Sequence, residues 1–283
     1  MFTAVSFHAH PDDEALLCGG TLARAAADGH RVVIVYATDG SRGLTGAQAD
    51  PAELGATRRA EARAAAVALG AARVEFLGYA DAGSDAPADP PTAGPPRFVD
   101  IEPAAAAARL AAILTSERAD LLTIYDARGG YGHPDHLRVH EVGVLAGALA
   151  HTRVVLEATV DRTQLWRAAR WAAKIPGVPA DFGAVRIRDG YTAPEFLTHR
   201  VDVRSYAPQK RAAMAAHRSQ TAGGVGARTL AVFLRVPGPV FRAVFGHEWF
   251  VERGRPAAQP LCDDIFDSLR GTPAGRGAPA VAR

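Results

Sequence analysis

Apolar and polar residues form alternating blocks along the first 160 residues, and these blocks predict strands separated by helices. Continuous apolar or β-branched runs, typical of strands covered on both faces, occur at residues 3–8, 31–38, 73–77, 120–125 and 153–160. Segments of helical composition lie between them at residues 13–28, 52–69, 103–118 and 135–150. The repeated strand–helix order predicts an α/β fold with a mostly parallel, doubly wound sheet and helices on both faces.

The pattern is looser after residue 160, where it predicts a helix at 162–174, a strand at 196–203 and a helix at 205–219. We therefore expect a single domain over residues 1–270, with a core at 1–160 and a smaller C-terminal α+β part at 161–270. A Pro-rich stretch at residues 81–97 predicts a long loop. The Gly, Pro, Ala and Arg composition of residues 271–283 predicts a disordered tail.

Composition and charge exclude several other classes of protein. A hydrophobic content of 48% with 22% charged residues is ordinary for a globular chain, and a net charge of +2 is too small and too diffuse to indicate a nucleic-acid partner. Cys18 and Cys262 are the only thiols, which predicts no disulfide framework and a reducing compartment. No targeting segment or membrane span is expected, because the most apolar stretch, residues 230–245, is interrupted by arginines and prolines. We expect a cytoplasmic protein with no membrane partner. Residues 230–245 could pack into the domain, line a cleft or form a contact in a homo-oligomer.

Two clusters of histidines and carboxylates follow predicted strands. The sequence His-Ala-His-Pro-Asp-Asp-Glu at residues 8–14 follows the first strand, and Tyr-Gly-His-Pro-Asp-His at residues 131–136 comes soon after the strand at 120–125. Ligands of α/β sheets bind at the carboxyl ends of the strands, where both clusters fall. So many carboxylates need a cation to offset their repulsion, and the mixture of nitrogen and oxygen ligands favours zinc or a similar transition metal. The two clusters are therefore predicted to be halves of one metal site.

The residue types also suggest a reaction. A catalytic zinc takes three protein ligands and leaves a position for water. His10 and Asp13 are predicted to be two of the ligands, and His133 or His136 could be the third. Asp12 is then free to act as a general base towards that water, and the remaining histidine could stabilise an oxyanion or protonate a leaving amine. These roles predict metal-assisted hydrolysis of an amide or ester. A metal-dependent phosphoesterase is the alternative, although it would be expected to need more bridging carboxylates.

The two clusters resemble the motifs of the PIG-L/LmbE-like family of zinc-dependent N-deacetylases, which act on N-acetylglucosaminyl substrates. Further stretches are similar to actinobacterial members, including mycothiol-pathway deacetylases and amidases, at residues 57–61, 77–81, 210–220, 248–250 and 263–266. The resemblance implies a Rossmann-like fold and one Zn²⁺ per chain, with Fe²⁺ as the alternative metal. It also implies hydrolysis of the N-acetyl group of a small molecule that contains an amino sugar.

The resemblance assigns a role to individual residues. It implies that the metal ligands are His10, Asp13 and His136, and that the general base is Asp12.

For the residues around these four, the resemblance implies supporting roles. His133 would act on the oxyanion or as a general acid, oriented by Asp135, and Tyr131 would be a mobile tyrosine that assists at the tetrahedral intermediate. Arg58 and Asp81 match sugar-binding positions.

Simpler structural roles compete for the residues outside the two clusters. Arg58 and Glu61 lie three apart on a predicted helix and could form an ion pair on its surface. His8 is expected to support the metal without binding it, and His140 to be a supporting or buried histidine. His217 could pack within its helix or lie at the rim of the site.

The substrate stays open at this stage. Residues 82–84 read Ala-Gly-Ser, where mycothiol-type members usually have Ser-Gly-Met. A mycothiol precursor, a mycothiol S-conjugate cleaved by an amidase, and an acetylated antibiotic intermediate are all compatible with the motifs.

Overall fold

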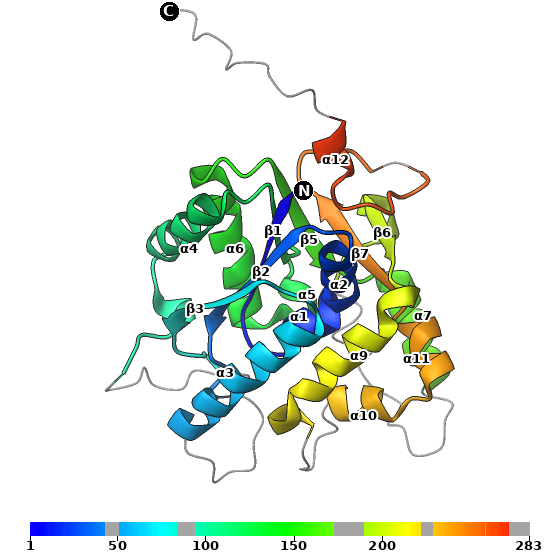
Figure 1. Ribbon diagram of the computed structural model, residues 1–283, viewed down its shortest axis with the longest axis horizontal. Coiled ribbons are helices and arrows are strands. Elements are labelled where there is room, and N and C mark those ends of the chain that lie inside the picture. The colour runs from blue at the N-terminus through cyan, green and yellow to red at the C-terminus, as the bar shows by residue number, and fades with distance from the viewer. Residues whose placement is uncertain (43–50, 84–93, 173–189, 222–228, 258, 272–283) are drawn as a thin grey trace, which may run out of the picture.

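Seven strands form one sheet in the computed structural model of the chain, in the order β3-β2-β1-β4-β5-β7-β6 (Figure 1). The strands are β1 (Thr3–His8), β2 (Arg31–Thr38), β3 (Arg73–Tyr79), β4 (Leu121–Tyr125), β5 (Val154–Thr159), β6 (His199–Asp202) and β7 (His247–Glu252). The structure describes residues 1–42, 51–83, 94–172, 190–221, 229–257 and 259–271.

The first five strands are parallel to one another, as the continuous apolar runs predicted. Their order reverses between β1 and β4, because the chain proceeds from β1 to β2 and β3 on one side and continues through β4 and β5 on the other. Such a switch point opens a crevice at the carboxyl ends of the two central strands. The predicted α/β fold with a mostly parallel, doubly wound sheet is therefore confirmed.

Helices cover both faces of the sheet (Figure 1). The α-helices are α1 (Asp13–Leu17), α2 (Gly19–Ala27), α3 (Pro51–Ala68), α4 (Pro103–Glu117), α5 (Gly129–Gly132), α6 (Pro134–Leu149), α7 (Arg162–Ala172), α9 (Ala207–Ala216), α10 (Thr229–Arg235), α11 (Gly238–Val244) and α12 (Asp267–Arg270). Short 3₁₀ turns lie at Phe98–Asp100, Pro194–Phe196, Arg204–Tyr206 and Arg218–Gln220.

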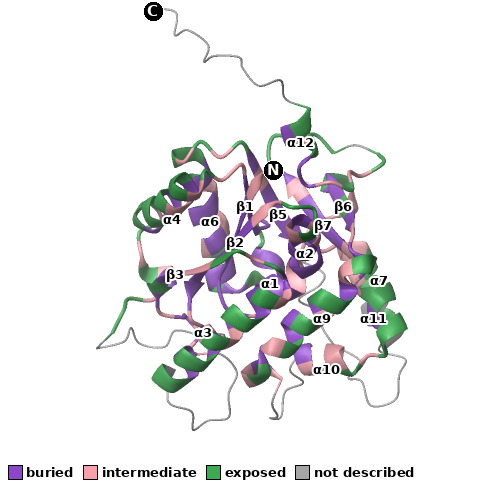
Figure 2. Ribbon diagram, in the orientation of Figure 1, coloured by how far each residue is buried: buried purple, intermediate pink, exposed green. Residues whose placement is uncertain are grey.

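Alternate residues of the central strands contribute to two separate cores, one on each side of the sheet. Val5 and Phe7 pack in a cluster with α4 and α6, whereas Ala4 belongs to a cluster with α2, α3 and α9. Figure 2 shows the strands buried between exposed helix surfaces. This three-layer arrangement leaves the carboxyl ends of the strands as the place for a site.

The N-terminal elements agree with the sequence within two residues at each end, apart from the helix predicted at 13–28. That segment is two helices, α1 and α2, interrupted at Cys18. The carboxylate of Glu248 accepts hydrogen bonds from the backbone N–H groups of Gly20 and Thr21, at 2.8 and 2.7 Å, and so caps the start of α2. Gly20 also allows a close approach, because a Cβ there would lie 2.5 Å from the Cβ of Val203. The break thus depends on residues more than 180 positions away in the chain.

The C-terminal part extends the same sheet with two antiparallel strands. The predicted strand at 196–203 is shorter, as β6, and β7 lies between β5 and β6 although the apolar pattern predicted no strand there. The helix predicted at 205–219 is α9 flanked by 3₁₀ turns, and it is interrupted at His217. Because both strands complete the sheet begun by β1 to β5, we propose that residues 1–270 form one domain.

The apolar stretch at 230–245 packs into the domain only in part, because Val232, Val240 and Val244 are exposed. It forms α10 and α11, and Leu230 and Phe241 are buried in the core cluster that contains α9. Cys18 is buried in the same cluster, and neither cysteine forms a disulfide. None of the helices in the described ranges is both long and apolar enough to cross a membrane. The predicted tail lies outside the described residues apart from Gly271.

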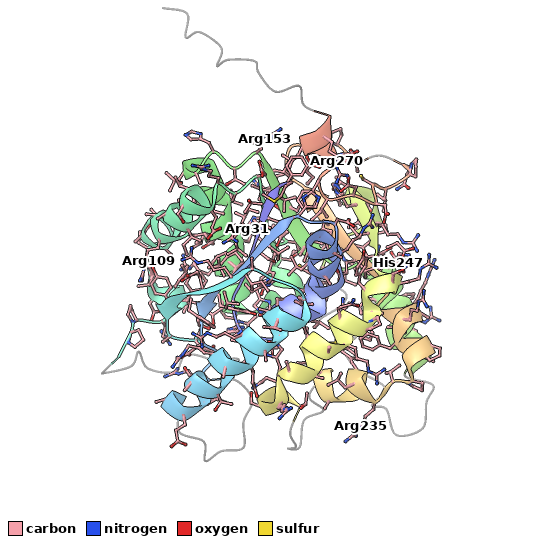
Figure 3. All side chains as sticks on the ribbon, viewed as in Figure 1. Arg31, Arg109, Arg153, Arg235, His247 and Arg270 are labelled. Atoms are coloured by element: carbon pink, nitrogen blue, oxygen red, sulfur yellow. The ribbon has the colours of Figure 1, made fainter. Side chains whose placement is uncertain are left out.

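Charged side chains are spread over the outside of the molecule. Among those labelled in Figure 3, Arg109 lies on α4, Arg235 at the end of α10 and Arg270 on α12, on three different sides. The labelled arginines therefore do not form one basic patch.

Candidate active site

The two histidine clusters meet at the switch point of the sheet. The first follows β1, and the second follows β4 and begins α6, where His133 occupies the N-cap position. The rings of His10, His133 and His136 lie with their centroids 4.9 to 5.6 Å apart. All three histidines are buried, each with 8% or less of its surface exposed. The prediction that the clusters share one crevice is thus confirmed.

Asp13 lies between two of these rings. Its Oδ2 is 3.4 Å from His10 Nδ1 and also 3.4 Å from His136 Nε2. Neighbouring ligand atoms in a tetrahedral zinc site, with bonds of about 2.0–2.2 Å, lie roughly 3.3–3.5 Å apart. His136 Nε2 is buried and has no hydrogen-bond partner, which costs free energy unless something else binds it. Donor atoms for a metal ion are therefore present, since ligand atoms of His10, His133 and His136 lie within 4.8 Å of one another and Asp13 contacts two of these rings. Burial alone would raise the pKa of Asp13, but the rings of His136 and His10 hold this pKa well below its usual range.

The ring of His10 is oriented from behind by two carboxylates. His10 Nε2 lies 3.0 Å from Asp135 Oδ2 and 3.4 Å from Asp81 Oδ1. Carboxylates in this position fix the orientation of a metal-binding histidine and raise its basicity. With Nε2 engaged, Nδ1 is the atom of His10 that faces Asp13 and is available to a metal.

This geometry differs from two expectations. Asp135 was expected to orient His133, but its carboxylate meets His10 and the backbone N–H of Ala82, at 3.0 Å each. Asp81 was expected to bind a sugar, but it is only 3% exposed, and it accepts the backbone N–H of Gly83 as well as facing His10. The structure thus brings both carboxylates to the ring of His10.

His133 has a distinct environment from the other two histidines. Its Nδ1 accepts a hydrogen bond from the backbone N–H of Asp135 at 3.1 Å, so a neutral ring carries its proton on Nε2. Burial and the nearby His10 and His136 lower the pKa of His133 to about 4. A neutral ring with Nε2–H is a donor to an oxyanion rather than a ligand through that nitrogen. This favours His136 over His133 as the third metal ligand.

Asp12 stands beside the cluster with its carboxylate partly exposed, at 24%. It occupies the N-cap position of α1, but its side chain makes no capping hydrogen bond. Burial raises the pKa of Asp12 to about 6, an effect that Arg58 opposes and Asp13 reinforces. A carboxylate with this pKa is suited to accept a proton near neutral pH.

Arg58 holds the loop that carries Asp12. Its guanidinium donates to the carbonyl oxygens of Pro11 and Gly40, at 2.5 and 2.7 Å, and lies 3.3 Å from Asp12 Oδ2. Gly40 has a positive φ of 66°, and a Cβ there would lie 2.5 Å from the guanidinium carbon. Arg58 is only 2% exposed, so the alternative of a surface pair with Glu61 is wrong.

A buried carboxylate and imidazole lie behind Asp12, and neither was predicted to have a role of this kind. Glu14 Oε1 lies 2.6 Å from His217 Nε2, and both side chains are fully buried. His217 is therefore packed in the interior and does not lie at a rim. Burial alone would lower the pKa of His217, but the Glu14 carboxylate raises it. Two features of the sequence could have pointed to this pair. Glu14 lies inside the first cluster, and His217 lies inside the stretch 210–220.

Tyr131 is placed at the entrance to the crevice. It lies on the short helix α5, is 40% exposed, and its ring centroid is 5.0 Å from that of His136. The backbone of Gly130 in this turn is non-helical, with φ 64° and ψ −97°, and its N–H is held by the Asp126 carboxylate at 2.9 Å. An exposed phenol beside the cluster is positioned to meet a substrate.

His8 and His140 support the site through Tyr125. The ring of Tyr125 packs 4.5 Å from that of His136, centroid to centroid. His8 Nδ1 lies 3.3 Å from the Tyr125 hydroxyl, and His140 Nδ1 lies 3.0 Å from the Tyr125 carbonyl oxygen. Both histidines thus contact Tyr125, which packs against His136, and their role in supporting a metal stays a prediction.

A doubly wound sheet that brings two histidines and an aspartate together, with a further carboxylate beside them, has the arrangement of a metal-dependent hydrolase.

Comparison with known proteins is more specific. Residues 5–146 match the PIG-L family, described as GlcNAc-PI de-N-acetylase, and the chain belongs to this family. It is 34% identical to a protein of Actinosynnema mirum named 1D-myo-inositol 2-acetamido-2-deoxy-alpha-D-glucopyranoside deacetylase, over 93% of this chain and 96% of that one. A protein of the same name from Acidothermus cellulolyticus is 33% identical, over 95% of each chain. Like these deacetylases, the chain is a hydrolase that acts on an amide bond.

Solved structures agree with the fold. The conserved protein TT1542 from Thermus thermophilus has a TM-score of 0.58 at 22% identity, covering 91% of this chain and 97% of that one. The N,N'-diacetylchitobiose deacetylase from Pyrococcus horikoshii has a TM-score of 0.56 at 22% identity, covering 88% of this chain and 83% of that one. The expected Rossmann-like architecture is therefore shared with these proteins.

Proposed function

We propose that the chain is a zinc-dependent deacetylase that removes the acetyl group from an N-acetylglucosamine unit linked to a small molecule such as an inositol. The observation that carries the proposal is the position of Asp13 Oδ2, 3.4 Å from both His10 Nδ1 and His136 Nε2. The names of the actinobacterial relatives support the substrate class. The mixed nitrogen and oxygen donor set supports zinc, with Fe²⁺ as the alternative.

The metal would be held by His10, Asp13 and His136, and when bound it would supply a Lewis acid for a water molecule and for the amide carbonyl. Asp12 takes a proton from that water as the new C–O bond forms. His133 donates its Nε2–H to the oxygen on which negative charge develops, because its Nδ1 is occupied by a backbone N–H.

The C–N bond then breaks, and the proton held by Asp12 passes to the leaving nitrogen, which gives acetate and a free amine. Tyr131 lies at the open side of the cluster, where its hydroxyl can contact the substrate. Arg58 and Asp81 belong to the support of Asp12 and His10, so we propose that they affect substrate binding only indirectly. Two cysteines without a disulfide are consistent with a cytoplasmic setting, which we propose for this reaction.

The test is a panel of substrates given to the purified protein after chelation and reconstitution with Zn²⁺ or Fe²⁺. The panel contains the inositol-linked N-acetylglucosamine, a mycothiol S-conjugate, an N-acetylated aminoglycoside fragment and an aryl phosphate. We expect metal-dependent release of acetate and a free amine from the inositol-linked sugar. Turnover of the S-conjugate alone would make the chain an amidase of that type. Hydrolysis of the aryl phosphate alone would overturn the proposal.

A further inference from the structure

The buried pair of Glu14 and His217 is not used by the mechanism described above, yet it lies directly behind the general base. One carboxylate oxygen of Glu14 meets His217 Nε2 at 2.6 Å. The other accepts the backbone N–H of Asp12 at 2.9 Å. The pair therefore joins α9, in the C-terminal part, to the backbone of the catalytic loop.

The backbone of Asp12 needs such support. Its φ is 114° and its ψ is −30°, in a region that residues with a Cβ rarely adopt. Conformations of this kind persist only where the surroundings hold them, and they are concentrated at functional sites. Glu14 holds the N–H of Asp12, and Arg58 holds the preceding carbonyl of Pro11. These two backbone contacts, together with the Arg58 guanidinium 3.3 Å from Oδ2, orient the Asp12 carboxylate.

The His217 end of the pair is fixed in turn by α3. Glu61 accepts hydrogen bonds from the backbone N–H and the hydroxyl of Ser219, each at 2.7 Å. These bonds hold the 3₁₀ turn that follows α9, and His217 is the residue between the helix and that turn. Because α3 also carries Arg58, one helix braces both contacts to the Asp12 loop.

A second buried carboxylate provides a comparison within the same molecule. Glu248 is 2% exposed, binds Lys210 Nζ at 2.6 Å and accepts the backbone N–H groups of Gly20 and Thr21. Its bonding therefore resembles that of Glu14, but the backbone that it holds belongs to α2 and carries no site residue. The two glutamates have similar bonding partners, but Glu14 binds the backbone of Asp12 and Glu248 binds the backbone of α2.

We propose that the Glu14–His217 pair is a positioning device for Asp12, which holds the general base in its productive orientation without contacting substrate or metal. The inference rests on the role proposed above for Asp12. A carboxylate displaced by about 1 Å from its working position can cost a factor of about 10² in rate. The pair should accordingly affect kcat much more than it affects KM or metal binding.

The first experiment compares Glu14→Gln with Glu248→Gln, and kcat, KM and metal content are measured per folded molecule of the zinc-loaded enzyme. For Glu14→Gln we expect kcat to fall by about 10- to 100-fold, with KM and metal content unchanged. Glu248→Gln should lower thermal stability and leave kcat unchanged. A conservative change, His217→Gln, keeps a donor to Glu14 and should retain more activity than His217→Leu. If Glu14→Gln fails to fold, the two His217 variants make the same comparison.

The second experiment places Glu14→Gln in an Asp12→Ala background. If Glu14 acts through Asp12, its replacement should not lower the residual rate further. The same fold-loss in both backgrounds would overturn the proposal, as would an unchanged kcat in folded Glu14→Gln and His217→Leu.

A third measurement separates this inference from the proposed function. If the wild-type enzyme releases no acetate from any substrate, the proposed function fails, and crystal structures of Glu14→Gln and of wild type then decide the inference. We expect the φ of Asp12 to relax towards a common region in the variant. A φ that stays near the wild-type value would overturn the positioning role.

Discussion

The two parts of the chain contribute to the active site in different ways. The proposed metal ligands and the proposed general base all come from residues 1–160, in the segments that follow β1 and β4. Residues 161–270 provide none of the proposed ligands, but His217 contacts Glu14 behind the Asp12 loop, and Ser219 is hydrogen-bonded to Glu61 of α3. The first part supplies the side chains of the proposed site, and the second part helps to orient one of them, the carboxylate of Asp12.

This division implies two kinds of damage. Changes to the ligands should remove the metal together with the activity. Changes in the C-terminal part should leave the metal bound and alter either catalysis or stability, depending on which carboxylate they reach. The predictions below test this division, beginning with the largest expected effect.

Replacing a ligand should have the greatest effect. We expect His136→Ala to lose both metal and activity, because its Nε2 is a proposed ligand atom and has no hydrogen-bond partner among the described residues. The measurements are metal content by mass spectrometry and acetate release, and His140→Ala is the control on the same helix. A His136→Ala protein that still bound one equivalent of metal tightly would show that the ligand set is wrong.

Removing the general base should separate the two functions of the first cluster. We expect Asp12→Ala to bind metal normally and to lose about 10²–10⁴-fold in kcat, the usual contribution of general acid–base catalysis. Metal titration and steady-state kinetics measure this. Equal metal loss in Asp12→Ala and His136→Ala would contradict the assignment of base and ligand.

Breaking the other buried carboxylate pair should affect stability alone. Glu248→Gln removes the carboxylate that pairs with the buried Lys210 ammonium. Breaking a buried ion pair in this way typically lowers the free energy of unfolding by about 3–5 kcal/mol. Chemical denaturation measures the loss. An unfolding free energy equal to that of the wild type would show that the contact between α2, α9 and β7 is dispensable.

The smallest effect concerns pH and a histidine in the C-terminal part. Burial lowers the pKa of His199 to about 4, although Glu252, 3.7 Å away, opposes the shift. The unfolded chain therefore binds a proton on His199 near pH 6.5, before the folded protein does, and stability is lost as the pH falls from about 6.5 towards 4. At pH 5 the loss is about 2 kcal/mol from this residue. The difference in unfolding free energy between wild type and His199→Gln should shrink or reverse from pH 7 to pH 5. A difference that is independent of pH would contradict the shift.

How much of this could be predicted from the sequence follows the same division. β1 and β2 begin and end where their apolar runs predicted, because a strand buried on both faces is specified by its own residues. The meeting of the two clusters was predictable because each comes after a parallel strand of the sheet centre, so that topology brings them together.

The remaining features depend on contacts between distant residues. The interruption at Cys18 requires Glu248, which lies 228 residues beyond Gly20. The burial of Arg58 depends on carbonyl groups of two separate loops, and no local pattern distinguishes it from a surface arginine. β7 is central between β5 and β6 and yet is antiparallel to both, an arrangement that the strand–helix alternation did not include.

The contact between Glu14 and His217 spans 203 residues of chain. Loop closure over such a distance is slow compared with the formation of local helices and neighbouring strands. During synthesis the ligands of the first part can therefore assemble well before the last contact behind Asp12 exists. In a refolding experiment, metal uptake should precede the return of catalysis, and the delay would record the docking of α9. Enzymatic activity in this protein is thus a signal that the final stage of folding has been completed.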